Sequence, residues 1–262
     1  MALRQDRGAT RETPRKGPAR TIGLVLVSAL VFAGILIVRL PASWVIGRVG
    51  HGVACSSASG SIWDGYCSEL RVSGTSFGQV TWQVQPASLL SGRLAAHLTM
   101  MRGNAQARAD AAVTWNGTVT ARDLTADLPL DSTLMAVLPP AVAGTLHLAL
   151  RRIEVTRTGV IRRLRGRIEV HNLVDSSGQV TPLGSFEVTF PGGTGEPTGR
   201  LRDLGGPLWL EGTLRLTRQP GYDLHALVAA RESAVPSLVT ALEYLGSPDA
   251  EGRRPFALSG TY

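Results

Sequence analysis

An uncharged apolar run near the N-terminus constrains this chain more than any other feature. Residues 21–38 (TIGLVLVSALVFAGILIV) contain no Asp, Glu, Lys or Arg. A helix that rises about 1.5 Å per residue and continues to Ile46 would cross a hydrocarbon core of roughly 30 Å. We therefore expect one transmembrane helix over residues 21–46.

The flanking residues predict the orientation of this helix. Residues 1–20 hold six basic and two acidic side chains, and basic segments next to a membrane helix stay in the cytoplasm. Arg20 and Arg39 stand where an arginine can reach the headgroups, and Trp44 suits the membrane interface. We expect a basic cytoplasmic tail over 1–20 and a periplasmic domain over 47–262, in a bacterial inner membrane.

The main alternative for the apolar run is a cleaved signal peptide. The run is longer than the usual apolar region of a signal peptide, about 7–15 residues, and no small-residue cleavage site follows it. The segment Val53-Ala54-Cys55 resembles a lipoprotein cleavage site only faintly, because Gly52 replaces the large aliphatic residue of such sites. Both observations favour a retained anchor.

The two cysteines, Cys55 and Cys67, both follow the expected membrane helix. Exported proteins form disulfides, and no nearby His or Cys completes a metal site. We expect a disulfide, worth about 3 kcal/mol through the chain entropy of the unfolded state. The alternative is two free thiols.

The net charge of +7 is concentrated in the N-terminal tail. Residues 1–20 carry a net charge of +4, which leaves only +3 for the other 242 residues. A nucleic-acid-binding domain would carry its basic groups on one folded face. We therefore expect no nucleic-acid partner.

Hydrophobic and polar residues alternate along many short segments after the apolar run. Such alternation places one face of a strand on a core and the other toward solvent. Examples are Leu94–Met100, Leu146–Leu150, Ile168–Val170, Leu208–Leu216, Leu224–Val228 and Phe256–Gly260. The turn pairs Asn116-Gly117, Gly192-Gly193 and Pro220-Gly221 separate the runs, and 191–199 is expected to be a loop. The pattern predicts a mainly β domain built as an antiparallel meander.

A weak repeat of strand, short helical turn and strand occurs three times. The expected helical turns are 86–91, 131–138 and about 233–245. In the third, Leu238 and Leu242 belong to one apolar stripe that can pack on a sheet. Such units predict a long, curved sheet capped by short helices.

Catalytic and metal-binding patterns are weak in this sequence. The string Gly74–Gly78 matches the pattern of a nucleophile elbow around Ser76, but a strand rather than a helix is expected after it. An exported hydrolase would also need a base near Ser76, and the sequence offers none. The five histidines (His51, His97, His147, His171, His225) have no metal-ligand spacing. Three of them stand inside predicted strands, and we favour solvated strand faces over metal ligation. We expect no enzymatic activity, no cofactor and no metal.

Seven arginines occur within 17 residues, interleaved with aliphatic side chains. They are Arg151, Arg152, Arg157, Arg162, Arg163, Arg165 and Arg167. They could bind an acidic partner or anionic lipid headgroups. The interpretation we favour is a solvated strand face or edge that charge protects from aggregation.

Several short motifs resemble those of the type II secretion system protein N (GspN) family. They are Leu40–Trp44, Gly60–Gly65 (GSIWDG), Trp82–Pro86, Leu89–Leu94, Gly205–Gly212 and Gly221–Leu224. The family-motif residues are Gly60, Trp63, Gly65, Trp82, Pro86, Gly92, Gly206, Pro207 and Gly212. The motifs extend from the expected anchor almost to the C-terminus in the family's order. The cysteine pair fits only some members of this family, which indicates a subgroup.

The resemblance implies a structural or adaptor subunit of the machine that exports folded proteins across the outer membrane. Its implied partners are other secretion subunits, on the inner-membrane platform or the secretin side, together with membrane lipids. A homo-oligomer is a further option. The resemblance also implies a relationship to AsmA-like proteins, whose curled sheets form an apolar groove. The alternative function is therefore a periplasmic, AsmA-like lipid-handling groove protein.

Overall fold

The computed structural model describes residues 28, 32, 52–72, 75–130, 142–177 and 180–261. The chain divides into two compact units, Met1–Leu40 and Pro41–Tyr262. Apart from Ser28 and Phe32, the expected transmembrane helix lies outside the described residues, as do Arg20, Arg39, Trp44 and the expected helical turn at 131–138. Within the described residues, no helix is both long and apolar enough to span a membrane.

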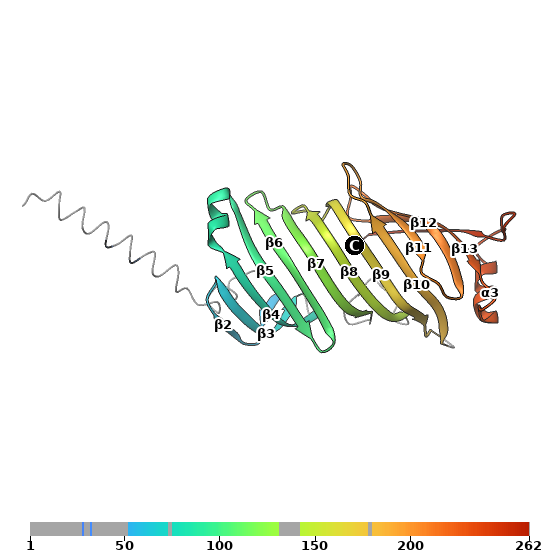
Figure 1. The fold of residues 1–262 in the computed structure, drawn as a ribbon, viewed down its shortest axis with the longest axis horizontal. Helices are drawn as coiled ribbons and strands as arrows, with labels where there is room; N and C mark the ends of the chain where they lie inside the picture. The colour runs from blue at the N-terminus through green and yellow to red at the C-terminus, as the bar shows by residue number, and fades with distance from the viewer. Residues whose placement is uncertain are drawn as a thin grey trace, which may run out of the picture. The chain divides into compact units, whose positions relative to one another are not determined.

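The second unit is one antiparallel sheet in which each strand follows its neighbour along the chain (Figure 1). Its first half contains β1 (Val53–Cys55), β2 (Ala58–Gly60), β3 (Asp64–Val72), β4 (Thr75–Gln85), β5 (Arg93–Arg102), β6 (Ala105–Thr114) and β7 (Val119–Leu130). Its second half contains β8 (Val142–Val155), β9 (Ile161–Asp175), β10 (Thr181–Phe190), β11 (Thr198–Asp203), β12 (Leu208–Leu216), β13 (Tyr222–Ala230) and β14 (Arg254–Gly260). β1 and β2 both pair with β3, and β14 forms the other edge of the described sheet. The predicted antiparallel meander is confirmed.

Two short helical elements interrupt the meander. The 3₁₀ helix η1 (Pro86–Ser91) connects β4 to β5, and the α-helix α3 (Pro236–Glu243) connects β13 to β14. Pro86 begins η1, where a missing N–H costs nothing, and Gly92 ends it with a φ of 69°. Two of the three expected helical turns are therefore confirmed.

The expected turns are also present. The amide of Gly117 donates to the carbonyl of Thr114 at 2.8 Å, and the amide of Thr217 donates to the carbonyl of Gly221 at 3.0 Å. The loop expected at 191–199 ends two residues early, because Thr198 and Gly199 already pair with β12.

Strand alternation gives the sheet an apolar face and a polar face. On the apolar face, Leu148 stands opposite Ala126 on β7 and Ile168 on β9, and Ile168 stands opposite Val188 on β10. One position away along the same strands, the register aligns Asp127, His147, Glu169 and Glu187 on the polar face. The period-2 pattern of the sequence therefore produces this division directly.

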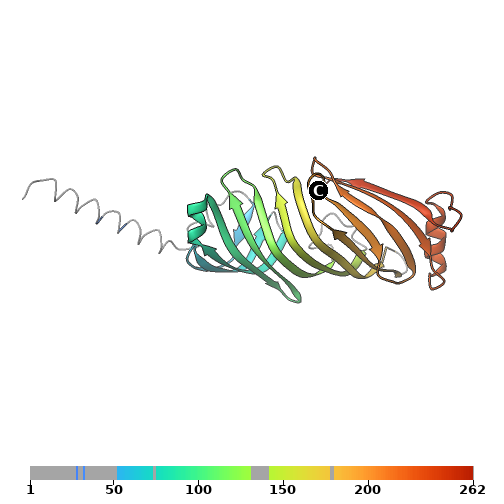
Figure 2. The same cartoon turned by 45° about the horizontal axis from the view of Figure 1, so that its top comes forward.

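The sheet bends toward its apolar face in the second half. A buried cluster joins Leu150 on β8, Phe190 on β10 and Leu216 on β12. At one end of these strands, a Cβ added to Gly159 would lie only 3.9 Å from Cγ of Pro220. Gly159 follows β8 and Pro220 follows β12, and β8 and β12 are four strands apart in the sheet. Because adjacent strands are about 4.8 Å apart, these two turns could not touch if the sheet were flat. Figure 2 shows the curvature of the strands.

Helix α3 covers the apolar face near β12 and β13. Leu238 and Leu242 are buried in a cluster with Leu208 and Val228. These two leucines are four positions apart, on the stripe that the sequence predicts.

Candidate functional surface

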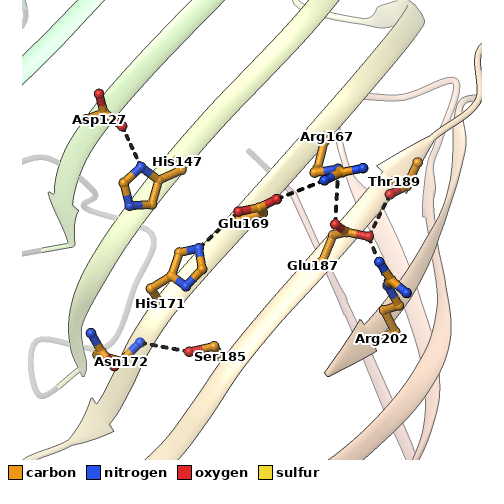
Figure 3. A network of polar contacts seen from close by, with 10 residues as sticks. All are labelled: Asp127, His147, Arg167, Glu169, His171, Asn172, Ser185, Glu187, Thr189 and Arg202. Atoms are coloured by element: carbon orange, nitrogen blue, oxygen red, sulfur yellow. Dashed lines mark hydrogen bonds and ion pairs between the residues drawn. The ribbon is translucent and has the colours of Figure 1, made fainter. Parts of the chain in front are cut away.

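A row of polar and ionisable side chains crosses the polar face strand by strand. Its members are directly opposite one another in the register: Gln106, Asp127, His147, Glu169, Glu187 and Arg202, on β6 to β11. We call this set the polar row. Figure 3 shows the part of it from Asp127 to Arg202 together with neighbouring side chains. Facing positions on adjacent strands bring side chains within contact distance, so charges can pair across the sheet.

Glu187 is the anchor of the polar row. It is only 3% exposed, and each of its two carboxylate oxygens forms an ion pair with an arginine on a different neighbouring strand. Arg167 Nε on β9 lies 3.0 Å from Oε2, and Arg202 Nε on β11 lies 3.0 Å from Oε1. The Thr189 hydroxyl also donates to Oε1 at 3.0 Å. A buried carboxylate needs such partners, so Glu187 links three consecutive strands.

Two histidines contribute here: His147 belongs to the polar row, and His171 lies on β9 two residues from the row member Glu169 (Figure 3). His147 Nδ1 lies 2.5 Å from Oδ1 of Asp127, and His171 Nε2 lies 3.0 Å from Oε2 of Glu169. The two rings meet edge to face with centroids 5.0 Å apart. A hydrogen bond from Gln106 and another from His147 lower the pKa of Asp127. A hydrogen bond from His171 lowers the pKa of Glu169 in the same way.

Four of the five histidines lie in strands, as expected, and His51 lies outside the described residues. The four are His97, His147, His171 and His225. However, sequence spacing missed the contact between His147 and His171, because their proximity depends on the register of β8 against β9. Within the described residues, no group of three His, Cys, Asp or Glu side chains is arranged to hold a metal.

The arginine-rich segment divides between paired and unpaired side chains. Arg152 and Arg163 both approach Oε2 of Glu154, at 3.5 and 3.6 Å, and Arg167 pairs with Glu187. These pairs fit the expected charged strand face. In the described part of the chain, Arg157 and Arg162 have no carboxylate partner.

The motif Gly60–Gly65 forms the tight connection between β2 and β3. Gly60 has a φ of 85°, and the amide of Ser61 donates to the carbonyl of Asp64 at 2.8 Å. The indole of Trp82 lies against Gly65, where an added Cβ would be 2.2 Å from Cζ2. Trp82 Nε1 donates to the carbonyl of Ile62 at 3.2 Å, which ties β4 to this turn. The motifs around Gly60 and Trp82 therefore meet in one structural unit.

Cys55 on β1 and Cys67 on β3 form the expected disulfide. Their Cα atoms are 5.9 Å apart, and Cys67 is buried. The bond fixes a three-residue edge strand that would otherwise depend on a few backbone hydrogen bonds.

The C-terminal motif surrounds an ion pair that sequence reasoning missed. Arg231 Nη2 lies 2.7 Å from Oδ1 of Asp203, and Nη1 donates to the carbonyls of Gly206 and Leu208. Asp203 also accepts from the amides of Gly205 and Leu210. Burial acts to raise the pKa of Asp203, but these hydrogen bonds outweigh burial and lower it.

Two motif glycines in this region are sites of close backbone approach. A Cβ at Gly206 would lie 2.7 Å from Cα of Gly184, and one at Gly212 would lie 2.6 Å from Cβ of Ala226. Pro207 stands between them, and its carbonyl accepts from the amide of Arg231 at 2.8 Å. The motif therefore fixes the turn between β11 and β12.

Ser76 does not occupy a nucleophile elbow. It lies inside β4, opposite Arg71, and its hydroxyl donates to Glu69 at 3.3 Å. A nucleophile elbow needs a strand before the serine and a helix after it, whereas β4 continues for nine residues beyond Ser76.

Comparison with known proteins identifies the family. A family model described as type II secretion system (T2SS), protein N matches residues 51–257. The chain belongs to the type II secretion system protein N family. A protein of this name from Aeromonas hydrophila is 26% identical over 249 residues, covering 90% of this chain and 98% of the relative. Another from Vibrio cholerae serotype O1 is 23% identical over 263 residues, covering 92% and 98%. No solved structure matches the chain significantly.

Membership of the protein N family agrees with the motif resemblance. The matched range includes the sheet from β1 into β14, and therefore the motif glycines, both motif tryptophans and the polar row. It does not include the expected membrane helix. The family assignment therefore concerns the folded sheet.

Proposed function

We propose that the protein is a structural adaptor of the type II secretion system, anchored in the inner membrane by residues 21–46 with its sheet in the periplasm. Protein N family membership supports the secretion role. The apolar run and the basic tail support the anchor and its orientation. The adaptor acts through its surfaces and performs no chemistry of its own.

The pairing of the polar row carries the adaptor proposal. Contacts bridge adjacent strands at two places in the row: Gln106, Asp127 and His147 join β6 to β8, and Glu187 joins Arg167 and Arg202 across β9 to β11. Groups paired across strands in this way hold a sheet rigid, whereas catalytic groups converge on a cleft in which a substrate binds. A rigid sheet is a suitable platform for another subunit.

The edge strand β14 is the surface we assign to that subunit. Among the described strands, β14 has a hydrogen-bonded neighbour, β13, on one side only. An extended segment of a secretion subunit can add to such an edge through backbone hydrogen bonds. A second copy of this chain is the other partner class that an open edge allows.

Site-specific photocrosslinking in the secreting bacterium tests this assignment. A photoreactive amino acid at Ser259, on β14, should crosslink to another secretion subunit. The matched control is the same amino acid at Thr99 on β5, which has strands on both sides. Equal crosslinking at both positions, or crosslinks only to lipid at Ser259, would contradict the adaptor proposal.

A second candidate, the lipid-handling groove, is favoured by one observation. Leu94, Val113 and Val119 form a row across β5, β6 and β7 on the apolar face, and all three are exposed. Exposed apolar side chains in register can hold an acyl chain. Native mass spectrometry of the purified full chain would support this function if phospholipid is retained and a Val113→Asp variant loses it.

A further inference from the structure

Four connections at one end of the sheet surround a pocket of about 790 Å³. They are the β6–β7 turn (115–118), the β8–β9 turn (156–160), the β10–β11 loop (191–197) and the β12–β13 turn (217–221). The bend that places Gly159 beside Pro220 creates this concavity. We call it the turn pocket.

The lining of the turn pocket combines an apolar part with a polar, cationic part. Val160, Ile161 and Leu216 supply apolar surface. The same lining contains five threonines: Thr118, Thr156, Thr158, Thr194 and Thr217. The hydroxyls of Thr156 and Thr158 bond to each other at 2.9 Å, and that of Thr217 donates to the carbonyl of Gln219 at 2.6 Å, so the lining arginines are the main donors for an anionic group. The pocket is therefore suited to a ligand with an anionic group attached to an apolar body.

The charge of the turn pocket is strongly positive. Arg157, Arg162, Arg163 and Arg218 line it, against the single carboxylate of Glu196, which gives a net charge of +3. Glu196 is already shared by Arg215 and Arg218. Arg163 approaches Glu154, but no carboxylate among the described residues pairs with Arg157 or Arg162. Guanidinium groups with unused donors bind phosphate oxygens well, often through two bonds.

Two exposed apolar side chains lie in connections at the same end of the sheet as the turn pocket. Trp115, which precedes the lining residue Asn116, is 80% exposed, and Leu90 at the end of η1 is 94% exposed. Trp115 packs near Gly92, where an added Cβ would lie 3.1 Å from its indole ring. Two large apolar residues in surface connections, next to arginines, have the composition of a membrane-interface contact. This arrangement favours a lipid surface over an acidic protein segment.

We propose that this end of the sheet docks on a membrane surface, where the turn pocket binds the phosphate of an anionic phospholipid and Trp115 enters the interfacial layer. Three of the arginines that the sequence analysis grouped, Arg157, Arg162 and Arg163, belong to this site. Membrane docking does not depend on the secretion role, because it requires only the residues at this end of the sheet. These arginines are not part of the polar row, and anionic phospholipid is the ligand class we assign to them.

The test uses the full chain in lipid nanodiscs. One nanodisc contains only phosphatidylcholine, and the other contains phosphatidylcholine with phosphatidylglycerol, each with brominated lipid as a fluorescence quencher. The Trp115 signal is the difference between the wild type and a Trp115→Phe variant, which removes the contributions of the other tryptophans. The apolar run anchors the chain equally in both nanodiscs. A difference in the Trp115 signal between the two nanodiscs therefore reports a difference in contact between Trp115 and lipid.

We expect quenching of Trp115 to be stronger with phosphatidylglycerol. An Arg157→Gln/Arg162→Gln variant should lower the docking equilibrium constant on the phosphatidylglycerol nanodisc about 30-fold, because each arginine near an anionic surface contributes about 1 kcal/mol. Arg102→Gln, at the other end of β5, is the matched control and should change nothing. Equal quenching in the two nanodiscs would overturn the proposal and leave an acidic protein surface as the partner class. An equal loss in the control variant would also overturn it.

Discussion

The absence of a side chain at one position, Gly65, allows the first turn of the sheet to close. At Gly65 the nearest atoms to an added Cβ are in the Trp82 indole and the Ser61 carbonyl. Because a backbone carbonyl cannot rotate away, even one methyl group must move the strand. Glycine is required here for close packing rather than for an unusual φ.

We predict that Gly65→Ala lowers the free energy of unfolding by about 1–3 kcal/mol, the usual cost of overpacking. Urea denaturation of the full chain in detergent measures this change. A Gly65→Ala/Trp82→Leu double variant should lose less than the sum of the two single variants, because leucine removes the ring that clashes. Strict additivity of the two changes would exclude the indole as the cause.

The ion pair between Asp203 and Arg231 makes stability depend on pH. The folded state lowers the pKa of Asp203, so its carboxylate stabilises the fold above the ordinary pKa of about 3.9. That contribution is lost as the pH falls through the lowered folded pKa. The stabilising effect is therefore complete at neutral pH and absent in strong acid.

We predict that Asp203→Asn costs about 1–3 kcal/mol at pH 7, since it weakens the hydrogen bonds to Arg231 and two amides. The difference from the wild type should shrink as the pH falls below about 4. Urea midpoints at pH 7, 5 and 3 measure it. Asp64→Asn, in an exposed position of β3, is the control. A difference that stays constant down to pH 3 would exclude the carboxylate charge as its origin.

At the scale of elements, α3 is too short to be stable alone and depends on its contact with the sheet. It has eight residues, and isolated helices of this length are marginal in water. Leu238 and Leu242 bury its apolar stripe against Leu208 and Val228. The helix therefore forms because the sheet offers an apolar face.

We predict that Leu238→Ala lowers the free energy of unfolding by about 2–4 kcal/mol, through lost burial and the cavity that remains. Leu238 is 5% exposed, whereas its neighbour Val239 is 41% exposed. Val239→Ala on the same helix should therefore stay within about 0.5 kcal/mol of the wild type. Urea denaturation followed by tryptophan fluorescence compares them. Similar losses in both variants would mean that helix propensity, rather than burial, controls this element.

At the scale of the whole sheet, stability should be uneven along the strand order. Buried clusters join β8 to β12 and α3, whereas exposed apolar residues such as Leu94, Leu98 and Val113 occur on β5 and β6. Each strand of a meander contacts mainly its two neighbours, so distant parts of the sheet can open separately.

We predict that backbone amides of β5 and β6 exchange with solvent faster than those of β8 to β10. Hydrogen exchange of the full chain, followed by mass spectrometry of its peptides, measures this order. β6 and β9 provide a matched pair, because each has hydrogen-bonded strands on both sides. Uniform protection across the sheet would instead indicate one cooperative unit.

The features that depend on local chemistry could be predicted from the amino-acid sequence. The period-2 stripes predicted the strands, the Gly and Pro pairs predicted the turns, and the leucine spacing predicted the buried side of α3, because each follows from backbone geometry over a few residues. The motifs around Gly60 and Trp82 also indicated the family, since each is a short string of residues that can be recognised without knowing what it contacts.

Contacts between side chains that are far apart in the sequence could be seen only in the folded chain. The contact of His147 with His171 and the pairing of Asp203 with Arg231 depend on strand register and turn geometry. The turn pocket depends on the bend that joins the turns at Gly159 and Pro220. A strand pattern is the same in a flat sheet and in a bent one. The bend comes from burial of apolar side chains across several strands, which no single segment of sequence contains.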